Sequence, residues 1–343
     1  MSAWLLPLLG AAAAALLLLA VGVRALLRTS SGQENLGRAV APVGPESLDA
    51  ARRQARREAL VLALALASGI AATVLMAVLG GALPRLLGLP MALAGSVGAI
   101  VGLAVFSLVP RPAWPRAEGY RSAELVPREA WSFGRQWAFV VPLVEAGVLV
   151  LGLVAAGAAS SVDERGLHRV YATTGVAGWG IEGGRVVDVQ AGVHQAGPFP
   201  GWYYGVPLIL ATLLLVGAVY WSLRRVALAP RPAGAELFGI DTELRTLRTR
   251  FVMAASSAAL GIQVAGLSLM TGIVLRSAHT DPVPTPDIDG ATEFVSQQPG
   301  HSIGVVLIFA GLGLAVAAFV LLFAAIGAVR DAAHAAPAGV TTA

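Results

Sequence analysis

Long apolar runs separated by short polar segments dominate the chain. Seven runs each hold 19 or more largely apolar residues, enough for a helix to cross a hydrocarbon core about 30 Å thick. Because a backbone in lipid must satisfy its own hydrogen bonds, such runs predict transmembrane helices. The predicted spans cover residues 4–26, 60–82, 87–109, 137–158, 205–223, 251–275 and 303–328. The sequence therefore predicts an all-α, polytopic helix bundle, with residues 1–343 as a single transmembrane domain.

Arginine is distributed unevenly between the segments that separate these runs. All 24 basic residues are arginine; the segments after the first, third, fifth and seventh runs hold 19 of them, and the alternate segments hold 5. Because cytoplasmic loops carry the excess of basic residues, the N-terminus is predicted outside and the C-terminus in the cytoplasm. The first run has no positive region before it and is followed by Arg24 and Arg28, which favours an uncleaved helix over a signal peptide. We therefore expect a multi-pass protein of the cell membrane.

Three of the intervening segments have a readable character. Residues 28–58 are polar, contain Gly and Pro, and end in "AARRQARREAL", which predicts a cytoplasmic linker with a helical lead into the next span. Residues 159–204 form the larger exterior loop, where the β-favouring runs "LHRVYATTG" and "GRVVDVQAG" are separated by the glycine-rich "VAGWGIEGG". This pattern predicts a small β-hairpin. Residues 276–302 form a Pro-rich acidic exterior loop that we expect to be extended.

Composition narrows the class of protein further. Hydrophobic residues make up 56% of the 343 residues and charged residues only 13%, against about 25% charged in soluble domains. The absence of cysteine excludes disulfides, thiolate metal sites and cysteine nucleophiles. The net charge of +4 lies at helix ends and not on one soluble face, so nucleic-acid binding is not predicted. The predicted partner is the lipid bilayer.

Arginine-rich segments precede the second, fourth and sixth spans. They read "RRQARRE", "PREAWSFGRQW" and "DTELRTLRTRF". Each places guanidinium groups near the anionic inner leaflet, where one arginine is attracted by about 1 kcal/mol. These segments therefore predict anchoring to anionic inner-leaflet lipids. A docking surface for a cytoplasmic ATPase or another membrane subunit is a second interpretation.

Glu145 is the most costly residue in the predicted spans. It lies about 12 Å inside the fourth span at a rise of about 1.5 Å per residue, where a carboxylate costs on the order of 3 kcal/mol to insert. We therefore expect it to face the helix bundle, close to Pro142, which removes a backbone hydrogen bond. One interpretation is a proton or cation site, and the other is a neutral acid that holds helix packing in register. Gln263, at similar depth in the sixth span, is the first candidate partner.

Short similar sequences occur next to two of the spans. "VPRPAW" and "APRPAG" both follow a descending span, at an offset of 120 residues. Spans 3–4 and 5–6 are therefore candidates for a parallel repeat of the kind found in transporters, in which Gln263 would take nearly the position of Glu145. Gly98 and Gly102 form a GxxxG pair, which lets helix backbones approach closely. We expect this pair to serve packing within the chain rather than a dimer seam.

Three consecutive aromatic residues stand before the fifth span, in "GPFPGWYYGVP". Trp202, Tyr203 and Tyr204 fall on the predicted outer face, where aromatic rings settle at the membrane interface. Pro207 then lies in the first turn of the helix, where proline is tolerated. The stretch is predicted to anchor the chain where it re-enters the bilayer, and a cap over a pocket above Glu145 is the alternative.

The sequence contains no recognised catalytic motif. HExxH, G-x-S-x-G and Walker A patterns are missing, and the acidic stretch "DPVPTPDIDGATE" lacks the spacing of a calcium loop. No catalytic residue, metal or cofactor is predicted, and the protein is not expected to be an enzyme. The alternative is a membrane enzyme with an exterior active site, built from Asp163, Glu164, His168 and His194.

Three segments resemble multi-pass membrane proteins of actinobacteria that have no defined activity. They are "AELVPRE", "GPFPGWYYGVP" and "RPAGAELFGIDTELRTLRTR". The exclusive use of arginine fits such a high-GC source. The resemblance implies an accessory role in transport and supplies no functional residue. We therefore expect a non-enzymatic transporter-like or transport-accessory subunit, with a membrane sensor or regulatory partner as a further alternative.

Overall fold

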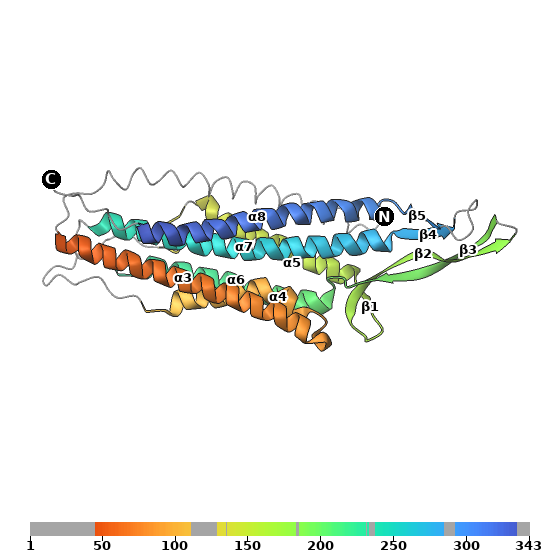
Figure 1. The fold of residues 1–343 in the computed structure, drawn as a ribbon, viewed down its shortest axis with the longest axis horizontal. Coiled ribbons are helices and arrows are strands. Elements are labelled where there is room, and N and C mark those ends of the chain that lie inside the picture. The colour runs from red at the N-terminus through yellow and green to blue at the C-terminus, as the bar shows by residue number, and fades with distance from the viewer. Residues whose placement is uncertain are drawn as a thin grey trace. The chain divides into compact units, whose positions relative to one another are not determined.

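The computed structural model describes residues 45–110, 129–134, 136–182, 185–230, 232, 237–284 and 292–334. This part of the chain is mostly helical and has six helices long and apolar enough to cross a membrane. They are α3 (Pro45–Ala82), α4 (Leu89–Leu108), α5 (Gln136–Ala159), α6 (Trp202–Leu228), α7 (Phe238–Ala278) and α8 (Gly300–His334) (Figure 1). The predicted span 4–26 and residues 28–44 of the predicted linker lie outside the described residues. The count of seven spans and the orientation of the termini therefore stay predictions.

Large apolar side chains are exposed on the faces of these helices. Met91 on α4, Leu151 on α5, Leu214 on α6, and Phe309 and Phe323 on α8 are each exposed over 65 to 69% of their surface. Soluble monomers rarely expose large apolar patches, whereas a surface that faces lipid is apolar. The six helices are therefore consistent with a multi-pass membrane protein in a lipid bilayer.

The helices extend beyond the predicted spans at their polar ends. α3 begins at Pro45 and not at residue 60, α7 begins at Phe238 and not at residue 251, and α8 ends at His334 and not at residue 328. The predicted linker over residues 28–58 is therefore helical from Pro45 onward. Hydropathy finds the part of a helix that crosses lipid, whereas Arg, Glu, Leu and Ala continue a helix into water with little loss of propensity.

The chain divides into two compact units. Among the described residues, the strand unit comprises Gly147–Leu210 and Ile262–Val316, and it holds all five strands. The arginine unit comprises the described parts of Leu18–Ala146, Ala211–Gly261 and Ala317–Ala343. Helices α5 to α8 contribute residues to both units, while α3 and α4 belong to the arginine unit alone.

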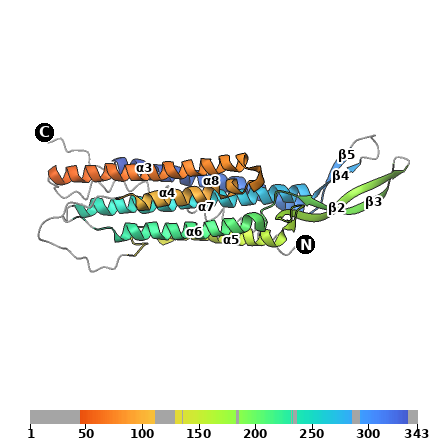
Figure 2. The same ribbon diagram turned by 90° about the horizontal axis from the view of Figure 1, so that it is seen from below.

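Within the arginine unit, α3 and α4 lie side by side (Figures 1 and 2). A short 3₁₀ turn at Pro84–Leu86 joins them. Leu87 and Gly88 follow it with φ angles of 50° and 81°, which lie in the left-handed region where glycine meets no steric penalty. The segment "GALPRLLGLP" therefore makes a tight connection between the two helices.

Glycines bring the backbones of α3 and α4 together. A Cβ atom on Gly98 would lie 2.7 Å from the carbonyl oxygen of Gly69, and one on Gly102 would lie 2.8 Å from that of Ala65. Neither distance leaves room for a side chain, so the close approach depends on glycine. The Gly98/Gly102 pair is thus confirmed as a packing surface within the chain.

The strand unit contains two antiparallel sheets built from the loops between helices. β1 (Ser161–Val162), β2 (His168–Glu182) and β3 (Arg185–Ala196) form one sheet in the order β1-β2-β3, and β4 (Thr280–Pro284) pairs with β5 (Thr292–Ser296) in the other. The hairpin expected between residues 159 and 204 is present as β2 and β3. β4 and β5 lie within the loop 276–302 that we expected to be merely extended.

Two sequence predictions need correction here. The glycine-rich "VAGWGIEGG", expected to separate the hairpin strands, lies mostly within β2, where it pairs with β3 as far as Glu182 and Arg185. Cross-strand pairing outweighs the weak strand propensity of glycine, because β-propensity depends strongly on context. The all-α class is likewise corrected to a mostly helical fold with strands in its loops.

Candidate functional site

α5 places one carboxyl group among apolar side chains. Glu145 is the only charged residue of this helix, whose exposed face carries Leu143 and Leu151. The Glu145 side chain is 1% exposed and lies on the face that also buries Val141 and Leu149, at a spacing of four residues in each direction. The helix therefore presents the carboxyl to the protein interior and not to lipid, as its cost in hydrocarbon requires.

The Glu145 carboxyl is buried and forms no hydrogen bond that the described residues complete. Neither of its oxygens has a hydrogen-bond partner among the residues that the structure describes, although the Ser257 hydroxyl of α7 lies close enough to act on it. Ser256 and Thr212, two other polar residues of the arginine unit, are fully buried. A buried carboxyl with no hydrogen bond is costly. The cost falls when the group holds a proton or a cation, so this position suits a group that takes up one of them.

Gln263, the expected partner of Glu145, is buried on α7. Its side chain is 8% exposed, and neither amide atom has a hydrogen-bond partner within the described ranges. Thr271, further along α7, is likewise buried with no such partner for its hydroxyl. Gln263 belongs to the strand unit and Glu145 to the arginine unit. Their pairing, and the repeat that would relate them, therefore stay predictions.

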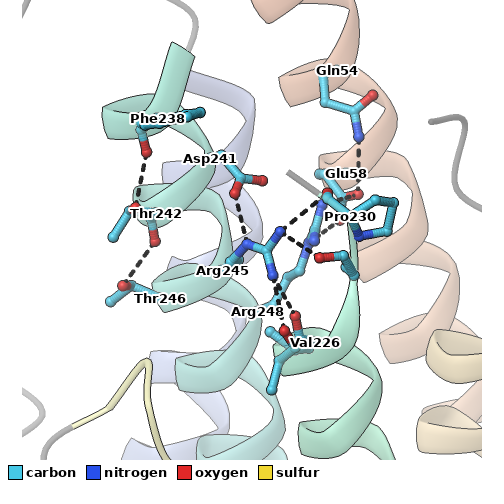
Figure 3. A network of polar contacts seen from close by, with 12 residues as sticks. Gln54, Glu58, Val226, Pro230, Phe238, Asp241, Thr242, Arg245, Thr246 and Arg248 are labelled. Carbon is cyan, nitrogen blue, oxygen red and sulfur yellow. Dashed lines mark hydrogen bonds and ion pairs between the residues drawn. The ribbon is translucent and has the colours of Figure 1, made fainter. Parts of the chain in front are cut away.

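A second group of buried polar residues joins α3 to α7 in the arginine unit (Figure 3). Arg248 of α7 forms a two-pronged ion pair with Glu58 of α3, in which Nε lies 2.8 Å from Oε2 and Nη2 donates to Oε1. Gln54, one turn before Glu58, donates to the same carboxylate over 3.5 Å. Glu58 is 2% exposed and Arg248 is 4% exposed. Two parallel bonds give this pair a fixed geometry.

Arg245 binds the C-terminal end of α6. Its Nε donates to Asp241 over 2.7 Å, and its terminal nitrogens donate to carbonyl oxygens at the end of α6 and just beyond it. Those carbonyls belong to Val226 (2.9 Å), Ala227 (3.3 Å), Ala229 (2.9 Å) and Pro230 (3.2 Å). The last carbonyls of a helix lack partners within it and carry partial negative charge. A buried guanidinium therefore stabilises this end and ties it to α7.

Two of the arginines expected at the lipid surface face the protein instead. In "DTELRTLRTRF", Arg245 is fully buried and Arg248 nearly so, and both bind groups of the chain, so anchoring to anionic lipids is the wrong prediction for them. Asp241, Arg245 and Arg248 follow one another at spacings of four and three residues, which places them on one helix face. This spacing, visible in the sequence, indicates that the three side chains lie close together on α7. Glu58 lies 190 residues from Arg248, and no local pattern indicates it.

The three aromatic residues at the start of α6 point in different directions. Trp202 is 36% exposed, Tyr203 is partly buried, and Tyr204 is only 3% exposed. Successive helix residues turn by about 100°, so the three rings do not share one face. Tyr204 meets the Tyr203 ring edge-on, interacts with Arg169, and is anchored to the protein rather than to the interface. Because α6 begins at Trp202, Pro207 lies in its second turn and not in its first.

Asp163, a residue of the alternative exterior site, organises the turn between β1 and β2. It accepts hydrogen bonds from the backbone N–H of Leu167 (2.9 Å) and Arg165 (2.8 Å) and forms an ion pair with Arg169. The hydrogen bond from Leu167, together with the Arg169 guanidinium, holds the pKa of the Asp163 carboxyl below its usual range despite an opposing effect of burial. These contacts stabilise a turn and account for the geometry of this carboxylate.

The other residues of that exterior site lie in separate surroundings. His168 Nδ1 is 3.5 Å from Ser160 Oγ, whereas His194 Nε2 is 2.7 Å from the carbonyl oxygen of Val176. Glu164 is exposed. Within the described part of the chain, no three His, Cys, Asp or Glu side chains form a group that could hold a metal ion.

Comparisons of this chain with protein-family models, with curated proteins and with solved structures found no match. Its function is therefore inferred from the chemistry of its own residues.

Proposed function

We propose that the protein is a non-enzymatic, multi-pass protein of the plasma membrane that acts as a transporter or a transport-accessory subunit, with Glu145 as a proton- or cation-binding group. One observation carries the proposal. Glu145 is 1% exposed in an otherwise apolar helix, and neither carboxyl oxygen is hydrogen-bonded to any described residue. A carboxyl that only held helices in register would be expected to form a well-made hydrogen bond, and the nearby Ser257 hydroxyl does not form one with it.

The backbone near Glu145 adds a second polar feature. Pro142 lies inside α5 and has no N–H to donate to the carbonyl of Ala138, four residues earlier. That carbonyl is an acceptor within two turns of the carboxyl. Ionisable residues inside a membrane are found mainly on ion and proton pathways, and a nearby carbonyl freed from its helical bond favours a bound cation or water there.

The rest of the arginine unit supplies a fixed framework in this proposal. Arg248 holds α3 to α7, and Arg245 holds the end of α6 to α7. The arginine distribution favours a cytoplasmic location for the arginine-rich ends of α3, α6 and α7, with the N-terminus outside. In an accessory role, the partner would be a second membrane subunit or a cytoplasmic ATPase.

Proton flux into proteoliposomes tests the proposal. The full chain is reconstituted in vesicles that contain a pH-sensitive dye, and a potassium diffusion potential drives proton entry. We expect flux with the wild-type chain and its loss with Glu145→Gln, because the amide has nearly the same shape but does not carry a proton. Glu243→Gln is the matched control, since Glu243 is a partly buried carboxyl in the polar first part of α7. It should leave the flux unchanged.

The comparison requires that both variants fold, which gel filtration and thermal unfolding establish. Equal flux through wild-type and Glu145→Gln vesicles would contradict the proposal. Wild-type flux no greater than that of empty vesicles, with protons and with sodium as the driven ion, would contradict the proposal for a transporter that acts alone. Glu145 would then be a structural acid.

A further inference from the structure

Aromatic and arginine residues are paired along the last turns of α6. Tyr220 is followed four residues later by Arg224, and Trp221 by Arg225. All four residues are exposed, Tyr220 over 54% and Trp221 over 44% of its surface. Residues four apart are neighbours on a helix surface, so each ring lies one turn below a guanidinium group. For Trp221 the contact is direct, with Arg225 Cζ 5.8 Å from the ring centroid.

Helix geometry places these pairs at the edge of the hydrocarbon. Tyr220 follows Trp202, the exposed ring at the other end of α6, by 18 residues. This spacing corresponds to five full turns and about 27 Å, close to the hydrocarbon thickness of about 30 Å. The two rings therefore lie on one face of the helix, at the depths where aromatic residues mark the two interfaces of a bilayer.

The face of α6 between these two rings is apolar. Val206, Leu210, Leu213 and Leu214 are each exposed over 49 to 66% of their surface. Arg224 and Arg225 lie about 6 Å beyond Tyr220 and Trp221 along the helix. That distance takes the guanidinium groups out of the hydrocarbon and into the layer that holds the lipid phosphates.

α4 holds one of the two guanidinium groups in place. Arg225 Nη1 donates to the carbonyl oxygen of Ser107 in the last turn of α4, and the hydroxyls of Ser107 and Ser222 lie 2.9 Å apart. Arg225 is thus positioned without an acidic partner among the described residues. Arg224, beside it, makes no hydrogen bond or ion pair with any described residue.

No acidic residue of α4 or α6 balances the positive charge of Arg224 and Arg225. Neither α4 nor α6 contains an Asp or Glu residue. Leu108 at the end of α4 and Leu228 at the end of α6 are each exposed over 62% of their surface. Two positive groups beside aliphatic and aromatic surface match a molecule with a negative headgroup and an acyl chain. A free anion would use the charges but not the apolar surface.

We propose that Arg224, Arg225 and Trp221 bind the phosphate of an anionic phospholipid in the leaflet at this end of α6, with its acyl chain along the exposed apolar residues. Arg225 supplies a donor held by α4, Arg224 an exposed donor without a bond to the described chain, and the rings set the depth. The site is independent of Glu145 and of the transport proposal. General anchoring needs only an arginine-rich segment near the membrane surface. This site is instead defined by the side chains of Arg224 and Arg225 and by the end of α4.

Lipid retention by the purified full chain tests this proposal. The protein is transferred to detergent micelles that contain equal amounts of phosphatidylglycerol and phosphatidylcholine, and native mass spectrometry measures the bound lipids. We expect the wild-type chain to retain phosphatidylglycerol preferentially, and Arg224→Gln to weaken that binding about fivefold, the equivalent of one arginine at an anionic surface. Arg276→Gln removes an exposed arginine at the far end of α7 and should change nothing.

Arg224→Gln removes no contact within the described chain, so the variant should fold, and gel filtration confirms this. Three results would overturn the proposal. They are equal retention of the two lipids by the wild-type chain, unchanged phosphatidylglycerol binding by Arg224→Gln, and displacement of the lipid by millimolar inorganic phosphate. The last result would identify a site for free anions instead of a lipid headgroup.

Discussion

Arg245 and Arg248 are neighbours on one face of α7, but the groups that bind them differ in kind. Arg245 binds main-chain carbonyls, which are present whatever side chains α6 carries, and the carboxylate of Asp241 on its own helix. Arg248 binds the carboxylate of Glu58 on another helix. The Glu58–Arg248 pair therefore depends on two side chains at once. Loss of either one leaves an unpaired charge in a buried position, which is more costly than loss of both.

At the Glu58–Arg248 pair, we predict that a single substitution destabilises more than a double one. Glu58→Leu should cost about 3 to 5 kcal/mol of unfolding free energy, because Arg248 keeps its charge without a partner. Glu58→Leu combined with Arg248→Met should recover most of that loss, since no charge remains to be buried. Unfolding in mixed micelles, followed by circular dichroism, measures all three proteins, and the cycle gives the coupling between the residues.

Arg52→Met is the matched control for this pair. Arg52 is paired with Asp49 on the same helix at 3.5 Å, and this pair is open to solvent, with Arg52 partly exposed and Asp49 exposed, so its loss should cost no more than about 1 kcal/mol. If Glu58→Leu cost as little as Arg52→Met, the pair would be solvated in the functioning protein. Its role in holding α3 to α7 would then be wrong.

At the scale of elements, hydropathy alone predicts where helices cross lipid but not where they end. The helices α4 and α5 match their predicted spans within two residues at each end, because polar segments or tight turns bound both. α3 and α7 continue into "AARRQARREAL" and "DTELRTLRTR", whose Ala, Leu, Arg and Glu residues favour a helix as strongly as lipid-facing residues do. The ends of these two helices pack on each other through Ala51, Ala55 and Leu244. Such packing between distant segments leaves only a faint periodicity in either one.

At the α3–α4 contact, we predict that the position of a glycine decides the effect of adding one methyl group. In Gly98→Ala the new Cβ would lie 2.7 Å from the backbone oxygen of Gly69, which cannot move aside without shifting α3. The variant should lose about 1 to 3 kcal/mol of stability. Gly81→Ala is the control within α3, because a Cβ there meets nothing within 4 Å, and it should be neutral or stabilising by up to about 1 kcal/mol. Equal unfolding midpoints for the two variants would contradict the close α3–α4 packing.

At the scale of the whole molecule, the sequence predicts the class of protein better than its site. Glu145 stands out because a lone carboxylate in an apolar run is rare, and the structure buries it as that rarity suggests. Which polar residue of α7 lies beside it was not predictable, because that depends on which face of α5 meets which face of α7. Glu58 and Arg248 read as surface charges for the same reason, since only the packing of α3 against α7 buries them.

The number of membrane crossings can be tested by cysteine labelling. It contains no cysteine, so single cysteines can report sidedness to a membrane-impermeant maleimide without further changes. Seven spans place Ser2→Cys and Glu164→Cys outside the cell and Thr246→Cys inside. The first two should therefore label in intact cells, and the third only after permeabilisation. If Ser2→Cys, like Thr246→Cys, were labelled only after permeabilisation, residues 4–26 would not cross the membrane. The number of crossings would then be even, and both termini would lie on the side of the arginine-rich segments.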